Sequence, residues 1–180
     1  MSNPYSVVLD ACVLAKKLHR NILLNLAAAD CFRPIWSDTI LTETVSAIDR
    51  MGGDGAKTRI ALETSFQSAL ADPSYIHLVR NFQLKDENDR HVVAVALQEH
   101  ADAICTDNDK DFGLSTIDVL TCDQFLTDTI DLAPVKALAA LATMRRQVSS
   151  FADGLDFVKL MRQRGLIETA AYLSPYSERL

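Results

Sequence analysis

The chain has little of several features that would place it in a special class. Glycine and proline number only six and five in 180 residues, which excludes a collagen-like or low-complexity chain. No apolar run approaches the roughly 20 residues that a membrane-spanning helix requires. The N-terminus also lacks the basic start and long apolar region of a signal peptide. We therefore expect a globular protein of the cytoplasm that does not associate with membranes.

Cysteine and basic side chains are also scarce. The four cysteines include no Cys-x-x-Cys pair and have no histidine at zinc-site spacing, so we interpret them as reduced core residues. They are Cys12, Cys31, Cys105 and Cys122. The net charge of −6 argues against holding nucleic acid through a broad basic surface. It does not exclude a nuclease that works through metal ions, because the bound cations reverse the field of their acidic ligands.

What the sequence does contain is an alternation of two hydrophobic patterns. Short β-branched and apolar runs predict strands, and apolar residues at helical spacing predict helices between them. Strands are expected at 5–9, 32–36, 75–79, 103–106 and 119–120. Helices are expected at 14–29, from Ser37 or Asp38 onward, at 57–71 and at 90–100. Such alternation predicts a three-layer α/β/α fold with a central, mainly parallel sheet.

The last part of the chain has only the helical pattern. From Pro134 onward apolar residues recur at helical spacing, with breaks near Asp153 and at Gly165. Because no linker or repeat separates this part, we expect it to pack on the same domain. We predict an α/β domain over 1–133 and a C-terminal helical extension over 134–180.

Acidic residues follow the predicted strands or begin the helices after them. Asp10 ends the first strand, Asp89 begins a helix, and residues 107–111 follow a later strand. In an open parallel sheet the carboxyl ends of the strands share one edge, so these groups can converge there. Glu43 joins this set from the helix after the second strand, on a side of that helix away from Leu41.

Carboxylates that converge repel one another unless a cation neutralises them. Oxygen-only ligands suit Mg²⁺ or Mn²⁺, which activate water and stabilise the leaving oxygen in phosphodiester cleavage. The arrangement therefore indicates a metal-dependent nuclease. For any single acid the alternative is a helix cap or turn residue, and only their joint placement favours the functional interpretation.

Four segments in this order resemble the PIN-domain family, in particular the VapC-like toxin ribonucleases of toxin–antitoxin pairs. They are Val-Leu-Asp-Ala at 8–11 and the segments 33–43, 85–94 and 103–112. The resemblance implies a PIN-like fold and an endoribonuclease that uses Mg²⁺ or Mn²⁺ to cleave RNA. It also implies a cognate antitoxin protein as partner.

Carried over residue by residue, the resemblance implies catalytic or metal-binding roles for Asp10, Glu43 and Asp89. The fourth position is open among Asp111, Asn108 and Asp107, in that order of preference, because Asp107 and Asp109 add carboxylates to the motif. Whether one metal or two are bound is open as well. Thr106 and Asp86 are candidates for groups that orient the ligands. The RNA target cannot be inferred from one chain.

Three rival interpretations exist for this pattern of residues. A phosphatase of the aspartyl type expects a second Asp two positions after Asp10, where Cys12 stands, and a receiver domain expects paired acids where Val8 and Leu9 stand. A catalytically silent PIN fold that binds RNA or protein is the remaining alternative. Against it, a scaffold has no need to gather like charges.

The helical extension has three roles open to it. Its apolar stripes complete the core, form a homodimer or receive an amphipathic segment of an antitoxin. The sequence alone does not choose among them.

Overall fold

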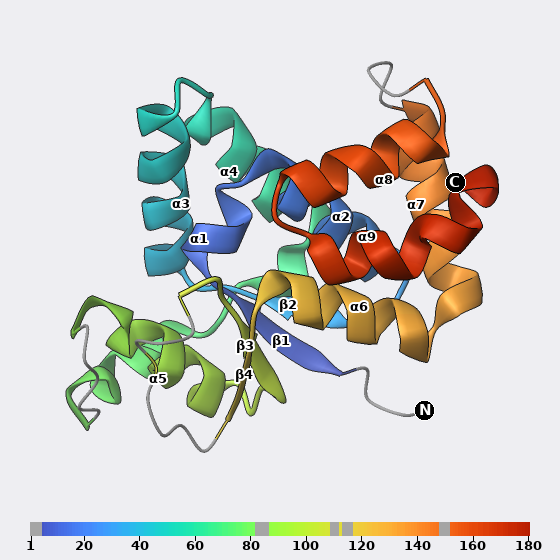
Figure 1. Cartoon of the computed structure of the whole chain (residues 1–180). Helices are drawn as coiled ribbons and strands as arrows, with labels where there is room; N and C mark the ends of the chain where they lie inside the picture. The colour runs from blue at the N-terminus through green and yellow to red at the C-terminus, as the bar shows by residue number, and fades with distance from the viewer. Residues whose placement is uncertain (1–4, 82–86, 109–111, 113–116, 148–151) are drawn as a thin grey trace. The chain divides into compact units, whose positions relative to one another are not determined.

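The structure is a computed structural model that describes residues 5–81, 87–108, 112, 117–147 and 152–180 (Figure 1). By its contacts the chain forms two compact units. Unit 1 comprises Met1–Lys16 and Arg33–Thr121, and unit 2 comprises Lys17–Phe32 and Cys122–Leu180. This division differs from the predicted boundary at 133/134, since unit 2 takes in one early segment and begins again at Cys122. The assignment of 1–133 as a nuclease domain and 134–180 as its extension stays a prediction.

Unit 1 is built around a four-stranded sheet. Its strands are β1 (Ser6–Leu9), β2 (Arg33–Ile35), β3 (Ala103–Cys105) and β4 (Asp118–Leu120). They lie in the order β2-β1-β3-β4, and each neighbouring pair is parallel. The α/β class with a mainly parallel sheet is therefore confirmed. Pro34 lies in the edge strand β2, where a missing N–H costs no ladder hydrogen bond.

The strand β1 is buried and is paired on both sides. Val7, Val8 and Leu9 are fully buried, as a continuous apolar run in a parallel sheet predicts. Val8 is paired with Ile35 of β2 on one side and with Ile104 of β3 on the other. The strands thus deliver their carboxyl ends, and the polar residues after them, to one edge.

Unit 1 also contains four described α-helices. They are α1 (Ala11–Leu14), α3 (Asp38–Arg50), α4 (Gly55–Ser65) and α5 (Arg90–Gln98). Short 3₁₀ helices are η1 (Gln67–Ala69), η2 (Pro73–His77), η3 (Val79–Asn81) and η4 (Glu87–Asp89). Helix α5 packs against β1 and β3, and its residues from His91 to Ala96 are all buried (Figure 1). Helix α3 begins with Ser37 as its N-cap, because the Ser37 hydroxyl accepts a hydrogen bond from the Ile40 N–H at 3.2 Å.

The strand predicted at 75–79 is wrong, because this segment forms 3₁₀ helices. Asp72 caps η2 by accepting a hydrogen bond from the Ser74 N–H at 2.8 Å. Pro73 occupies the first helical position, where its fixed φ favours a helical start. Only Tyr75 of η2 is buried, so the apolar run is not a core strand.

The helix predicted at 14–29 is confirmed over most of its length, but a separate short helix precedes it. Asp10 caps the short helix α1, and a bend at Ala15 and Lys16 separates it from α2 (Lys17–Ala28). The sequence pattern missed α1 because its apolar residues look like a continuation of the strand before it. The consequence is that Asp10 is at once the end of β1 and the cap of a helix.

Unit 2 is entirely helical in its described part. It contains α2, α6 (Cys122–Leu132), α7 (Pro134–Gln147), α8 (Gly154–Gln163), α9 (Ile167–Leu173) and η6 (Ser174–Arg179). Helix α2 packs on α7, and α9 packs on both α6 and α8. The Asp123 carboxylate fixes α9 to α6, because it accepts hydrogen bonds from the N–H groups of Glu168 (2.8 Å) and Thr169 (2.9 Å). Helix α6 was not predicted, and its contacts explain why unit 2 begins at Cys122.

Across the described ranges, no helix has both the length and the apolar character needed to cross a bilayer.

Candidate functional site

The Asp10 carboxylate lies at the carboxyl end of β1, with only 5% of the residue exposed. Its Oδ1 accepts a hydrogen bond from the Ala11 N–H at 2.6 Å. Its Oδ2 accepts one from the Thr106 hydroxyl at 2.7 Å and one from the Cys12 thiol at 3.2 Å. Three donors thus hold a buried carboxylate in one orientation at the sheet edge.

Cys12 takes part in this arrangement, although its sequence context predicts a core cysteine. Burial and the charge of Asp10 raise the pKa of the Cys12 thiol to about 12, so it keeps its proton at neutral pH. The same sulfur accepts a hydrogen bond from the Asp107 N–H at 3.2 Å. Cys12 therefore ties the Asp10 carboxylate to the loop after β3. The sequence signal for this role of Cys12 is its position two residues after Asp10.

Of the four cysteines, all free thiols, Cys105 and Cys122 are buried as expected, whereas Cys12 and Cys31 are only partly buried. The prediction that the cysteines are core residues is therefore wrong for Cys12 and Cys31. Their positions explain the difference: Cys12 faces polar groups at the sheet edge, and Cys31 follows the turn that ends α2.

Thr106 connects Asp10 to a second carboxylate. Its hydroxyl oxygen accepts a hydrogen bond from the Asn108 N–H at 3.1 Å. The Asn108 amide Nδ2 in turn donates to the Asp89 Oδ2 at 3.2 Å. A continuous network therefore runs from Asp10 through Thr106 and Asn108 to Asp89. It joins the ends of β1 and β3 to the start of α5.

Asp89 occupies the N-cap position of α5, yet its side chain makes no capping hydrogen bond. The capping interpretation of this residue is thus wrong. Its carboxylate is directed to Asn108 instead, at the sheet edge that carries Asp10.

Glu43 lies on α3 and is held by a histidine. Its Oε1 is 3.1 Å from Nε2 of His91, a residue of α5 that is 8% exposed. The other ring nitrogen, Nδ1, is buried and has no hydrogen-bond partner in the described part of the chain. Since Nε2 must carry the proton to donate to a carboxylate, His91 orients Glu43 from the core side of α5.

Asp107 is occupied by an ion pair. Its Oδ2 lies 2.7 Å from the Lys16 ammonium, and both side chains are partly exposed. Asp86, Asp109 and Asp111 lie outside the described residues. The preferred fourth position, Asp111, is therefore not placed here.

The side-chain oxygens at this edge are of the types that bind a hard divalent cation. Carboxylate and amide oxygens of Asp10, Asp89 and Asn108 are the ligand types that Mg²⁺ and Mn²⁺ prefer. Within the described ranges, however, no three acidic, histidine or cysteine side chains are grouped closely enough to hold a metal ion. The residues fit the cation by type, and Asp10 and Asp89 supply part of a site.

Comparison with known proteins gives a family for this geometry. No curated protein and no solved structure matches the chain significantly. A family model described as PIN domain matches residues 6–110, which begin at β1 and reach past Asn108. Because the match covers more than half of the chain and includes Asp10, Glu43 and Asp89, the chain belongs to the PIN domain family, whose members are in general nucleases.

Proposed function

We propose that the chain is a metal-dependent endoribonuclease that cleaves RNA phosphodiester bonds with the acidic residues at the carboxyl edge of its sheet. The observation that carries this proposal is the Asp10 carboxylate, which is buried and held by three donors next to the Asn108–Asp89 pair. Burying a carboxylate is costly, so a fixed one at the ligand-binding edge of a parallel sheet favours a chemical role.

Asp10 and Asp89, with Asn108, would hold the cation, and Glu43, Asp107 and Asp111 are the further candidates. When bound, Mg²⁺ or Mn²⁺ supplies Lewis acidity toward the scissile phosphate and the attacking water. The chain's own groups prepare this edge: Thr106 and Cys12 fix Asp10, Asn108 fixes Asp89, and His91 fixes Glu43. Preorganised ligands of this kind lose little entropy when the cation binds.

The proposal is tested by incubating the purified chain with structured and unstructured RNAs in Mg²⁺, in Mn²⁺ and in EDTA. We expect internal cleavage with either metal and none in EDTA. Intact RNA under all metal conditions, with the protein folded by circular dichroism, would favour a silent PIN fold that only binds RNA or protein.

A narrower assignment follows from the resemblance of the four sequence segments to VapC-like toxins. We propose that the chain is the toxin of a toxin–antitoxin pair, that it acts on cytoplasmic RNA, and that a cognate antitoxin binds it. A homodimer is a further proposal. These roles are supported by sequence resemblance, and the first predicts that induced expression of the chain arrests bacterial growth.

Replacing Thr106 by valine is expected to lower RNA cleavage by about tenfold to 100-fold, as is usual when a group that orients a metal ligand is lost. Valine keeps the shape of threonine but removes the hydroxyl that donates to Asp10 at 2.7 Å. The measurement is kcat/KM on a short RNA, together with the Mn²⁺ concentration that gives half-maximal cleavage, which we expect to rise.

Thr44→Val is the matched control for this variant. Thr44 is equally buried, at 1% exposure, but its hydroxyl donates only to the Ile40 carbonyl of its own helix α3. We expect Thr44→Val to cleave like the wild type. If both variants lost the same fraction of activity and kept the same metal requirement, an orienting role for Thr106 would be wrong.

A further inference from the structure

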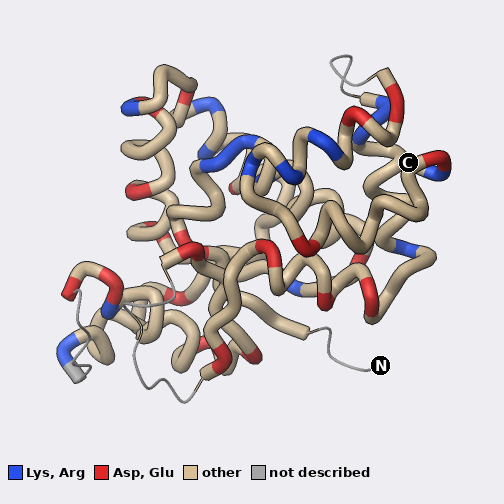
Figure 2. The backbone as a smooth tube through the Cα atoms, viewed as in Figure 1, with Lys and Arg blue, Asp and Glu red and all other residues tan. Residues whose placement is uncertain are grey.

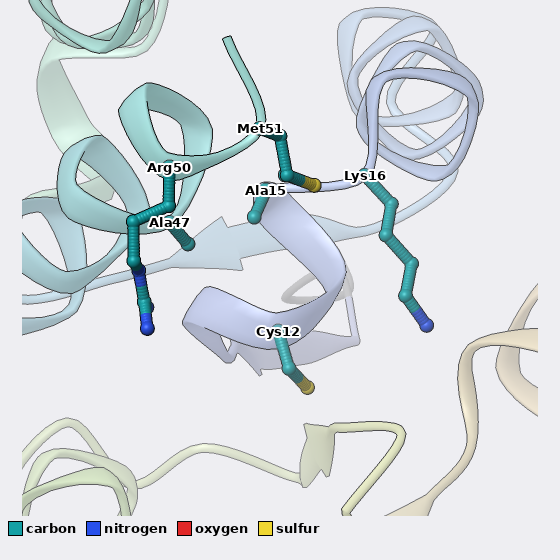
Figure 3. A pocket seen from close by; sticks show the side chains of 6 residues that line it. All are labelled: Cys12, Ala15, Lys16, Ala47, Arg50 and Met51. Carbon is teal, nitrogen blue, oxygen red and sulfur yellow. The ribbon is translucent and has the colours of Figure 1, made fainter. Parts of the chain in front are cut away.

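A groove opens in unit 1 beside the candidate site. It is an open hollow of about 360 Å³ between α1 and the end of α3 (Figure 3). It is lined by Cys12, Ala15, Lys16, Ala47, Arg50 and Met51. This volume is at the lower end of the range of about 300–1,000 Å³ for small-molecule sites, which is room for about one nucleotide.

The groove combines an apolar wall with two cations. Ala15, Ala47 and Met51 form the wall, and Met51 is 62% exposed although it is a large apolar residue. The Lys16 and Arg50 side chains extend on either side of it (Figure 3). A ligand that fits this lining has an apolar face and a negative charge.

Arg50 is the cation available for such a ligand. Its Nε donates to the Ser46 carbonyl at 3.2 Å, which holds the side chain along α3. Within the described part of the chain its terminal amino groups have no carboxylate partner. Lys16 differs, because it already pairs with Asp107.

The groove is continuous with the candidate site. Cys12, which lines it, donates a hydrogen bond to the Asp10 carboxylate and accepts one from the Asp107 N–H. Cys12 lies only two residues after Asp10. A ligand strand that crosses the site at Asp10 therefore also reaches the groove.

We propose that this groove binds the nucleotide next to the scissile phosphate of a single-stranded RNA. The base packs on Met51, and a phosphate lies against Arg50. This inference rests on the proposed function and adds a subsite to it. The thioether of methionine is polarizable and makes favourable contacts with aromatic rings, whichever base is present.

Charge complementarity supports a nucleic acid as the occupant. Acidic side chains outnumber basic ones in unit 1, so its net charge is negative and disfavours phosphate in general (Figure 2). Arg50 beside the apolar wall is a local exception, because no carboxylate in the described residues neutralises it, and it attracts an anion to that place. Steering phosphate to the groove rather than to the surface as a whole positions the strand across Asp10.

The test measures binding apart from cleavage. The full chain is titrated against a dye-labelled single-stranded RNA of eight mixed nucleotides in EDTA, at several NaCl concentrations, and a gel checks that the RNA stays intact. The variants are Arg50→Gln and Met51→Ala, with Arg80→Gln as the control. Arg80 is an exposed arginine of unit 1 that does not line the groove. Lys16 is left unchanged because it also holds Asp107.

The two groove variants should differ in how their Kd for RNA depends on salt. Arg50→Gln is expected to raise Kd about fivefold and to reduce the slope of log Kd against log salt by about 0.7, the value for one phosphate contact on a single strand. Met51→Ala is expected to raise Kd about threefold without changing this slope, because it removes no charge. Arg80→Gln should leave both quantities within about twofold of the wild type.

Failure of the subsite and failure of the proposed function give different results. A wild type that cuts RNA in Mg²⁺ or Mn²⁺ while both groove variants bind it normally keeps the function and loses the subsite. A wild type that binds through Arg50 and Met51 but does not cut keeps RNA binding in the groove and loses the function. No binding of the RNA by the folded wild type overturns the subsite. Equal loss in all three variants also overturns it, since that result indicates nonspecific attraction.

Discussion

Asp10→Asn is expected to reduce RNA cleavage at least about 100-fold while the chain stays folded. A hard cation requires the charge that asparagine lacks, and removing one preorganised electrostatic contact commonly costs a factor of about 100–1,000 in rate. The variant keeps the size of the side chain at a position that is 5% exposed. The measurement is kcat/KM on an RNA that the wild type cuts.

The fold should tolerate this change. Asparagine retains one oxygen for the Ala11 N–H, and its amide can donate to the Thr106 hydroxyl, which rotates to accept. We therefore expect a loss of only about 1 kcal/mol in the free energy of unfolding, close to the net worth of one hydrogen bond. Urea denaturation followed by circular dichroism measures it.

Asp102→Asn provides the matched control. The Asp102 carboxylate also accepts two hydrogen bonds in unit 1, from the Ser6 N–H at 2.7 Å and the Ser6 hydroxyl at 2.8 Å. It precedes β3, at the edge opposite to Asp10, and these hydrogen bonds hold its pKa below the usual range. This variant should cleave RNA like the wild type. Cleavage by Asp10→Asn above about a tenth of the wild-type rate would exclude Asp10 from the chemistry.

The same variant examines the proposed toxin role in cells. Induced expression of the wild-type chain in a bacterial host should arrest growth, and expression of Asp10→Asn to the same level should not. Arrest by both forms would mean that toxicity does not come from RNA cleavage. Normal growth with a wild type that cleaves RNA in vitro would argue against a toxin.

The sequence predicted the sheet well because each buried strand has a strong local signal. The run Val7 to Leu9 is apolar and β-branched, and Pro34 indicated an edge strand. The placement of Asp10 at the end of β1 followed from these strands alone, and Thr106 was predicted as the last residue of a strand at 103–106, one residue longer than β3. Their hydrogen bond depends only on parallel pairing of the two strands, so it was within reach of a sequence argument.

What the sequence could not predict depends on contacts between distant residues. The His91–Glu43 pair joins positions 48 residues apart, and no local pattern assigns an orientation to the imidazole. Helix α6 was not predicted because its apolar residues lie between a short predicted strand and Pro134. Next to that strand their helical spacing is not distinctive. The segment at 75–79 was assigned as a strand from its apolar residues, whereas the Asp72–Pro73 start fixes it as a 3₁₀ helix.

The role of Gly154 also depends on a contact with a distant segment, which the sequence did not predict. The sequence indicated a helix break near Asp153, and the structure shows that Asp153 caps α8 by accepting a hydrogen bond from the Asp156 N–H at 2.9 Å. Gly154 lies at the first position of α8 and is buried. Its lack of a side chain is required by a neighbouring segment rather than by its own backbone angles.

Gly154→Ala is expected to lower the free energy of unfolding of unit 2 by about 3 kcal/mol, at the upper end of the usual cost of overpacking. A Cβ at this position would overlap the Ser177 carbonyl oxygen and would lie 2.9 Å from Cβ of Leu180. The first of these atoms is backbone, so no rotamer change relieves the overlap, and η6 must move away from α8. Urea denaturation measures the loss, and faster proteolysis near the C-terminus would show where the chain has loosened.

Gly165→Ala separates this steric effect from a conformational one. Gly165 ends α8 with φ at +90°, and a Cβ there would meet nothing within 4 Å. Its replacement should therefore cost only the strain of a left-handed backbone, about 1 kcal/mol, without loosening η6. If the two variants lost equal stability, or if Gly154→Ala left proteolysis of the C-terminal segment unchanged, the close approach of Ser177 to α8 would be wrong. A much larger loss for Gly154→Ala would instead show that packing of η6 on α8 holds the C-terminal segment in place.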